Sequence, residues 1–234
     1  MNNEKVNLTN DAYSLHRILK TDIKKDPEVE EDEIIFGCGC FWGAEKCFWK
    51  LPGVVTTSVG YAGGEKNNPT YYEVCSGLTG HSEVVRVIWD KREIDVSDLL
   101  KMFWECHDPT QKNRQGNDIG TQYRSAIYYK NENNIKTILA SKEQYQAELS
   151  KKNLGLIETE IKMIDSYFYA EQYHQQYLAS AGSRQYCSAS PTKVKLGVFT
   201  GSNYKLEDHI WENFNWEVDK CVLRSDNNPI KNNI

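Results

Sequence analysis

The segment EIIFGCGCFWGAEKCFWKLPG (residues 33–53) contains the first strand and the first helix that the sequence predicts. Residues 33–37 form a short apolar run that ends in glycine, which favours a buried β-strand. Residues 44–51 carry apolar side chains at helical spacing and are followed by Pro52 and Gly53, which favours a helix that ends there. The folded part of the chain is therefore expected to begin with a strand followed by a helix.

Outward from this segment, the hydrophobic pattern continues as two strands, a helix and a further strand. The resulting order, β-α-β-β-α-β, is typical of the ferredoxin-like α/β (α+β) fold, a two-layer sandwich in which helices cover one face of a sheet. We expect this fold with an added C-terminal extension. The further strands are expected at residues 54–60, 83–89 and 124–129, and the second helix at residues 96–103.

The ends of the chain differ from this central region. Residues 1–32 are polar and charged, and are expected to form a mobile arm with at most a short helix. Residues 182–234 lack clear periodicity but keep many large apolar side chains, so this extension is expected to pack on the main domain, residues 33–181. Between the fourth strand and the extension we expect a helix at 135–149, a strand at 157–163 and a short helix at 170–178.

Composition excludes several classes of protein. The chain has 234 residues, of which 39% are apolar, enough for one sizeable globular domain, and its formal net charge of -5 offers no positive field for nucleic acid. No apolar stretch approaches the roughly 18 residues of a membrane span. An apolar leader is missing, and seven cysteines, an odd number, favour a reducing compartment over a complete disulfide framework. We therefore expect a cytoplasmic protein without nucleic-acid or membrane partners, and separately we expect a monomer.

Cys40 lies between the first predicted strand and helix, within Gly39-Cys40-Phe41-Trp42-Gly43. The partial positive charge of a helix N-terminus favours a thiolate, so the pKa of this thiol is expected to be lowered. The two aromatic rings that follow are expected to wall a partly exposed pocket beside the sulfur. A cysteine at the start of a helix is also commonly buried and inert, and the position alone leaves both interpretations open.

Two further polar features carry possible chemistry. Glu83 begins the apolar strand at 83–89, where desolvation would raise its pKa and suit it to general-acid catalysis; a solvated glutamate at a strand edge is the alternative. Residues 107–125 form a long polar loop between helix and strand, and long ordered loops in compact domains are usually functional. The alternative interpretation is that these residues form a network of turns that stabilises only the loop itself.

Six segments together resemble the peptide methionine sulfoxide reductases of the A type. The resemblance extends over residues 33–177, in the family's order and with fitting spacings, and implies a ferredoxin-like sandwich with its catalytic domain at 33–181. It also implies an oxidoreductase that reduces the S epimer of methionine sulfoxide, free and in oxidised proteins, to methionine. The segments are Gly39 to Gly43, Gly60 to Gly64, Asn68 to Tyr71, Thr79 to Val85, His107 to Ser125 and Ala170 to Tyr177.

The same resemblance assigns roles to individual residues. Cys40 would be the nucleophile and Glu83 the acid, because a thiolate attacks a sulfoxide sulfur readily only when the oxygen receives a proton. The product on Cys40 would be a sulfenic acid. No metal or bound cofactor is expected. Phe41 and Trp42 would wall the pocket for the substrate methyl group, and Tyr71, Asp118 and Tyr123 would complete its polar side.

Recycling of Cys40 is where this chain departs from the family. The family condenses its sulfenic acid with a second cysteine, and thioredoxin, or dithiothreitol in vitro, then reduces the disulfide. The Gly-rich segment that commonly follows the first recycling cysteine is absent here. Cys187 is the favoured resolving cysteine and Cys221 a candidate for a second step, whereas Cys38 is a strained partner two residues from Cys40. Cys47, Cys75 and Cys106 are expected to be inert.

Two rival hypotheses come from other classes of protein. A metal-binding protein would use Cys38 and Cys40 with His81, His107 or Cys187, although the chain lacks the paired C-x-x-C spacing of structural zinc sites. A non-catalytic module that binds oxidised proteins would need an unreactive Cys40. Turnover of a small sulfoxide with dithiothreitol distinguishes both from the enzyme.

Overall fold

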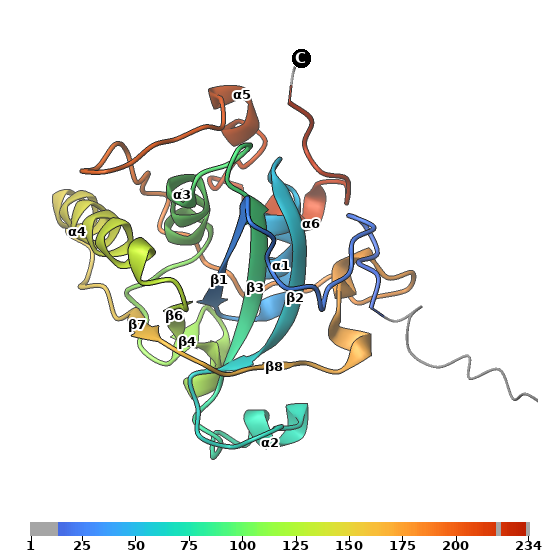
Figure 1. Cartoon of the computed structure of the whole chain (residues 1–234). Coiled ribbons are helices and arrows are strands. Elements are labelled where there is room, and N and C mark those ends of the chain that lie inside the picture. The colour runs from blue at the N-terminus through green and yellow to red at the C-terminus, as the bar shows by residue number, and fades with distance from the viewer. Residues whose placement is uncertain (1–13, 219–220, 233–234) are drawn as a thin grey trace, which may run out of the picture.

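A mixed six-stranded sheet lies at the centre of the computed structural model, which describes residues 14–218 and 221–232, without the side chain of residue 221 (Figure 1). Four strands pair antiparallel in the order β6-β1-β3-β2, and β7 and β8 extend the two edges. With α1 and α3, these four strands give the order β-α-β-β-α-β, so the predicted ferredoxin-like fold is confirmed. The strands are β1 (Glu31–Cys38), β2 (Val54–Ala62), β3 (Ser82–Asp90), β6 (Ser125–Tyr129), β7 (Glu160–Met163) and β8 (Tyr167–Tyr169).

Alternation along the strands divides the buried side chains between two faces of the sheet. Phe36 of β1 lies in the main core, where its ring stacks on Phe48 of α1 (Phe41–Trp49) at 4.8 Å and on Phe103 of α3 (Val96–Cys106) at 5.1 Å. Ile35, the next residue back, belongs to a smaller apolar cluster on the opposite face. The two helices therefore cover one face of the sheet and fix the end of β1, from which the chain enters α1.

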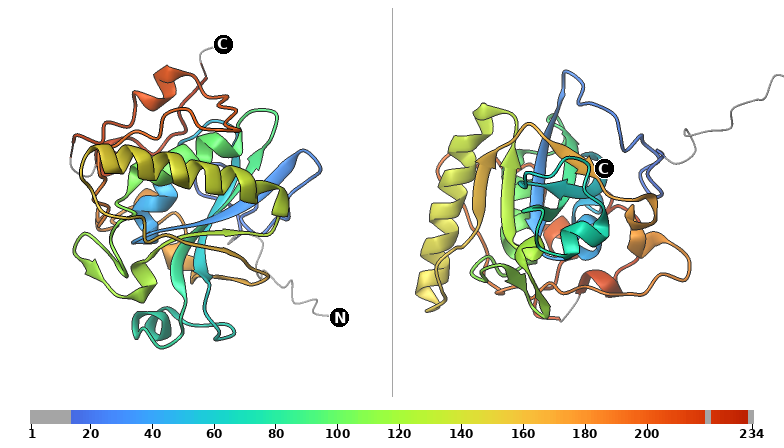
Figure 2. Two further views of the ribbon diagram at one scale, coloured as in Figure 1. Left: turned by 90° about the vertical axis from the view of Figure 1, so that its left-hand side faces the viewer. Right: turned by 90° about the horizontal axis from the view of Figure 1, so that it is seen from below.

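A third helix, α4 (Ile135–Lys151), packs beside α3. Trp104 stacks on Tyr145 with 5.5 Å between ring centroids, and its indole N–H donates to the Ser141 hydroxyl at 2.9 Å. Figure 2 shows α4 as the long yellow helix, with the orange and red C-terminal segment above it. The predicted helix at 135–149 is confirmed as part of this layer.

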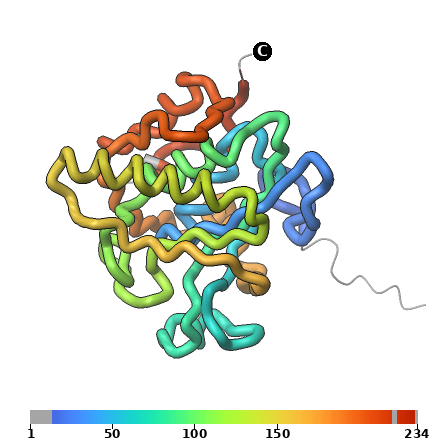
Figure 3. The backbone as a smooth tube through the Cα atoms, turned by 60° about the vertical axis from the view of Figure 1, so that its left-hand side comes forward, coloured from blue at the N-terminus to red at the C-terminus, as the bar shows by residue number. Residues whose placement is uncertain are grey.

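The C-terminal segment follows an irregular course over the helical side of the core, as Figure 3 shows in red. Its two short helices, α5 (Asp208–Trp211) and α6 (Cys221–Arg224), make up little of its length. Its last part is held by α1, because the ammonium group of Lys46 donates to the carbonyl oxygen of Ser225 at 2.8 Å. Its buried apolar side chains join the main core, namely Val194, Leu196, Phe199, Leu206, Ile210, Phe214 and Val222.

Two expectations were wrong. Residues 170–178 do not form one helix: two short 3-10 turns stand there, because the Glu45 carboxylate binds the backbone and side chain of Gln176, which has a left-handed backbone. Nor are residues 14–32 a mobile arm, since His16 and Ile23 are buried and the His16 ring bonds the Thr57 hydroxyl. The rest of the expected arm, residues 1–13, lies outside the described residues.

Several small elements were not predicted, among them the strand β8 and the short helices α5 and α6. The helix α2 (Tyr71–Cys75) begins with a capping box between Thr70 and Glu73, and the hairpin of β4 (Arg114–Gln115) and β5 (Asp118–Ile119) organises the long polar loop.

Among the described residues, none of the helices has the length and apolar character needed to cross a membrane.

Candidate active site

Cys40 occupies the N-cap position of α1, directly after β1 and a turn at Gly39. Gly39 has a φ of 84°, and a Cβ there would lie 2.5 Å from the side chain of Gln115, so both the turn and the packing require glycine. The predicted position at a helix start is therefore correct. The residue as a whole is only 8% exposed, which is less exposure than the sequence suggested.

The pKa of the Cys40 thiol lies well above its ordinary value, contrary to the expected lowering. Burial is the largest cause, and the nearby carboxyl group of Glu83 adds to it, whereas the backbone N–H of Trp42 acts in the opposite direction. The helix N-terminus is present as expected, but desolvation outweighs its effect. Cys40 therefore rests as a thiol and becomes a nucleophile only when its proton is transferred.

Glu83 enters the site from the start of β3 and is 2% exposed, so the alternative of a solvated strand-edge glutamate is wrong. Its carboxyl group accepts a hydrogen bond from the backbone N–H of Phe41 at 3.1 Å, which places it next to Cys40. Burial raises the pKa of Glu83 to about 8, with a further contribution from Asp118. The group is therefore protonated at neutral pH and can donate a proton.

The three polar residues that the resemblance singled out surround this acid. Tyr71 begins α2, Tyr123 lies in a 3-10 turn and Asp118 lies in β5. Burial and the nearby Glu83 raise the pKa of both Tyr71 and Tyr123, so each hydroxyl keeps its proton and can donate a hydrogen bond. Asp118 accepts a hydrogen bond from the Tyr186 hydroxyl at 2.5 Å.

The two aromatic residues after Cys40 behave differently from each other. Trp42 is half-buried, stacks on Tyr177 at 3.9 Å, and donates its indole N–H to Nδ1 of His174 at 3.1 Å. Phe41 is 1% exposed and belongs to the main core, so the expectation that it lines a partly exposed pocket away from that core is wrong. Only Trp42 matches the predicted half-exposed wall.

Cys187 of the extension lies against the first turn of α1. A Cβ built on Gly43 would be 2.4 Å from the Cys187 sulfur, so the missing side chain makes the space that this sulfur fills. Cys187 is 5% exposed and close enough to Cys40 to raise the pKa of that thiol. The structure thus brings together the two cysteines that the sequence paired. Cys221 was also a candidate, but its side chain lies outside the described residues.

Sequence reasoning missed the residues that hold this site in place. Glu171 accepts hydrogen bonds from the Tyr61 hydroxyl and from the backbone N–H of Tyr71, both at 2.8 Å. His174 lies among the rings of Phe41, Trp42, Tyr71 and Tyr173, and burial lowers its pKa to about 4, so the ring is neutral. Both residues lie in the Ala170 to Tyr177 segment, which was noted only as part of the resemblance.

The histidines of the metal-binding hypothesis have other partners. His81 accepts from the backbone N–H of Gly64 and bonds the Lys66 carbonyl oxygen, and His107 bonds the Phe103 carbonyl oxygen and the Ser125 hydroxyl. Within the part of the chain that the structure describes, Cys38, Cys106 and His107 alone form a group spaced closely enough for a metal ion. That group does not include Cys40. The described residues therefore do not form the metal site that the hypothesis predicted, which uses Cys38 and Cys40 together.

Comparisons with known proteins show the family to which the chain is similar. A family model described as peptide methionine sulfoxide reductase matches residues 32–204. The curated peptide methionine sulfoxide reductase MsrA of Vibrio vulnificus is 54% identical over 180 residues, which are 77% of this chain and 86% of the relative. That of Azotobacter vinelandii is 58% identical over 164 residues, 70% of this chain and 76% of the relative.

Two solved structures are also similar. Methionine sulfoxide reductase A of Corynebacterium diphtheriae gives a TM-score of 0.67 at 42% identity, and the match covers 78% of this chain and 88% of that one. The reduced form of Mxr1 from Saccharomyces cerevisiae gives a TM-score of 0.64 at 34% identity, with 70% and 92% covered. The similarity therefore extends from sequence to fold.

Proposed function

We propose a mechanism for this chain, which belongs to the peptide methionine sulfoxide reductase family and is an oxidoreductase of the MsrA type. Cys40 attacks the sulfur of methionine sulfoxide while Glu83 protonates the sulfoxide oxygen. The observation that carries this proposal is the buried carboxyl group of Glu83, held beside Cys40 by the backbone N–H of Phe41 and protonated at neutral pH.

The chemistry balances without a bound cofactor. As the bond between the Cys40 sulfur and the substrate sulfur forms, Glu83 gives its proton to the oxygen and then receives the proton that Cys40 loses. Transfer of the hydroxyl group to Cys40 breaks the sulfur–oxygen bond of the substrate, releases methionine and leaves Cys40 as a sulfenic acid. Glu83 ends the step protonated, as it began.

The surrounding groups stabilise this step. The hydroxyl groups of Tyr71 and Tyr123 keep their protons, so they can donate hydrogen bonds to the oxygen as negative charge develops there. Trp42 supplies an apolar wall for the substrate methyl group. Asp118, held by Tyr186, helps to keep Glu83 protonated.

The sulfenic acid is resolved by Cys187. The Cys187 sulfur displaces the hydroxyl group from Cys40 as water and forms a disulfide, which an external dithiol must then reduce. Thioredoxin is the proposed physiological reductant and dithiothreitol its substitute in vitro. The position of Cys187 over Gly43 supports this role, and Cys221 is the proposed site of a second exchange.

The proposed substrate is the S epimer of methionine sulfoxide, free or in oxidised proteins, because the two epimers require separate enzymes and similarity to the A type implies the S form. The test is turnover with dithiothreitol, measured separately on the purified S and R epimers of free methionine sulfoxide. We expect methionine from the S epimer only. Equal rates for the two epimers would contradict the specificity, and no product from either would support the non-catalytic binding module.

A further inference from the structure

Four cysteines line one small cavity behind the site. Cys38 ends β1, Cys47 lies in α1, Cys106 ends α3 and Cys187 comes from the extension. The cavity has a volume of about 20 Å³, room for roughly one water molecule, and apolar side chains such as Trp216 form the rest of its wall. The mechanism described above uses only Cys187 of these four.

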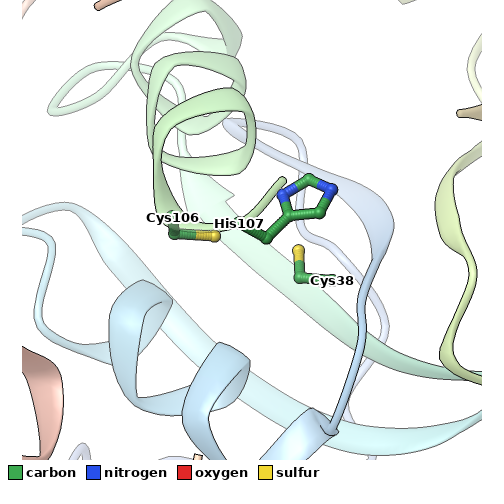
Figure 4. Close-up of side chains that lie close together, drawn as sticks. All are labelled: Cys38, Cys106 and His107. Carbon is green, nitrogen blue, oxygen red and sulfur yellow. The ribbon is translucent and has the colours of Figure 1, made fainter. Parts of the chain in front are cut away.

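Cys106 is the centre of this group. Its sulfur lies within 4.8 Å of the Cys38 sulfur, and the pKa of its thiol is affected by the thiols of Cys38 and Cys47 and by the nearby Cys187. Figure 4 shows the side chains of Cys106 and Cys38 lying close together beside His107. Cys187 is in turn electrostatically coupled to Cys40. The sulfurs therefore form a series from Cys40 through Cys187 and Cys106 to Cys38 and Cys47.

Metal binding fits this group less well than thiol chemistry. Cys38, Cys106 and His107 are close enough together, but both ring nitrogens of His107 already have partners at 2.7 Å, the Phe103 carbonyl oxygen and the Ser125 hydroxyl. A metal ion would have to break one of these buried hydrogen bonds. Exchange of a disulfide between neighbouring sulfurs leaves both His107 hydrogen bonds in place and removes only the weak hydrogen bond from the Cys106 thiol to the Phe103 carbonyl oxygen at 3.5 Å.

We propose that Cys106, with Cys38 or Cys47, is an internal dithiol that reduces the Cys40–Cys187 disulfide and stores a second pair of reducing equivalents. This inference rests on the proposed function, because methionine sulfoxide is the oxidant. It gives the enzyme two turnovers before any external reductant is needed.

Each step conserves sulfur–sulfur bonds, protons and electrons. The Cys106 sulfur attacks the Cys187 sulfur, and Cys40 leaves as a thiolate that takes up the proton lost by Cys106. The sulfur of Cys38 or Cys47 then attacks the Cys106 sulfur, and Cys187 leaves and is protonated in the same way. Cys106 and its neighbour are oxidised to a disulfide, whereas Cys40 and Cys187 are reduced and ready for a second substrate.

Burial sets the speed of this exchange. The pKa values of Cys47 and Cys106 lie well above their ordinary range, in both cases through the hydrogen bond to a neighbouring thiol and desolvation. Few thiolates are present at neutral pH, and the thiolate is the attacking form. The second methionine is therefore expected to form more slowly than the first, as a separate kinetic phase.

The test counts methionine formed without reductant. The Cys221→Ser protein, which lacks the other candidate for a second exchange, is reduced, freed of dithiothreitol and mixed with excess free methionine sulfoxide. We expect about two methionines per protein from this variant and about one from Cys221→Ser/Cys106→Ala, because the dithiol has lost its central thiol. Cys221→Ser/Cys75→Ala, which removes a thiol outside the cavity, is the matched control and should give about two.

Disulfide mapping of the Cys221→Ser protein after alkylation decides the same question without the Cys106 variant. We expect a disulfide between Cys106 and Cys38 or Cys47. A single methionine from the Cys221→Ser protein with Cys106 fully alkylated, or two methionines from the Cys221→Ser/Cys106→Ala protein, would overturn the inference. Absence of methionine even with dithiothreitol would instead contradict the proposed function.

Discussion

The sulfur of Cys187 fills the space that a side chain on Gly43 would occupy, 2.4 Å from the position of that missing Cβ. Gly43 lies in the first turn of α1, three residues after Cys40. The glycine that follows the two aromatic residues thus lets Cys187, the proposed resolving cysteine, approach the helix that begins at Cys40, the proposed nucleophile. We propose that the recycling step depends on this contact.

Gly43→Ala should therefore impair recycling and spare the first turnover. Overpacking of this kind costs about 1–3 kcal/mol, which applied to disulfide formation corresponds to a loss of roughly 5- to 160-fold. The measurement is the amount of Cys40–Cys187 disulfide formed after one equivalent of sulfoxide, beside the yield of methionine. Gly155→Ala is the control, because its new Cβ meets its nearest neighbour at an ordinary 3.4 Å. Unchanged formation of the Cys40–Cys187 disulfide in Gly43→Ala would show that recycling does not depend on this contact, and absence of that disulfide from the unsubstituted protein would remove Cys187 from this role.

Glu83→Gln should slow the chemical step by about 10²- to 10⁴-fold, the usual value of general-acid help. Glutamine has nearly the same shape and can still accept the hydrogen bond from the Phe41 N–H, so substrate binding and folding should persist. A single-turnover assay on free methionine sulfoxide separates this step from recycling. Equal rates for the two proteins would exclude Glu83 as the acid.

The rate of the first turnover should fall as the pH rises through about 8, the value to which burial raises the pKa of Glu83. The reactive enzyme holds both the Glu83 and the Cys40 protons, so loss of the Glu83 proton abolishes the acid. Asp118→Asn removes the nearby negative charge that helps to raise this pKa and should move the midpoint to lower pH. A rate that increases through pH 8 would show that free thiolate limits the reaction instead.

Trp42→Ala should lower kcat/KM for methionine sulfoxide much more than it lowers stability. Trp42 is half-buried and held by Tyr177 and His174, whereas Trp49 on the same helix is fully buried. Truncation of a core tryptophan costs about 3–5 kcal/mol, so Trp49→Ala is the control that loses stability. Urea unfolding and steady-state kinetics of both variants check this. A Trp42→Ala protein that loses stability as Trp49→Ala does, with normal kinetics, would assign Trp42 to the core.

The sequence predicted the features that local residue patterns determine. It did not predict the features that depend on contacts between segments far apart in the chain. The β-α-β-β-α-β order and the position of Cys40 at a helix start follow from periodicity and glycine placement. The high pKa of the Cys40 thiol does not follow from these local patterns. Desolvation and the nearby Glu83 cause it, and no local pattern places Glu83 beside that thiol. The break at Gln176 likewise depends on the Glu45 carboxylate, 131 residues earlier in the chain.

The central claim is that Cys40 takes oxygen from the substrate. The most direct measurement uses the Cys187→Ser/Cys221→Ser protein, mixed with one equivalent of methionine sulfoxide in the presence of dimedone, followed by peptide mass spectrometry. The account predicts methionine together with a dimedone adduct on the Cys40 peptide, and neither in the same protein carrying Cys40→Ser. Methionine formed by the Cys40→Ser protein would contradict it.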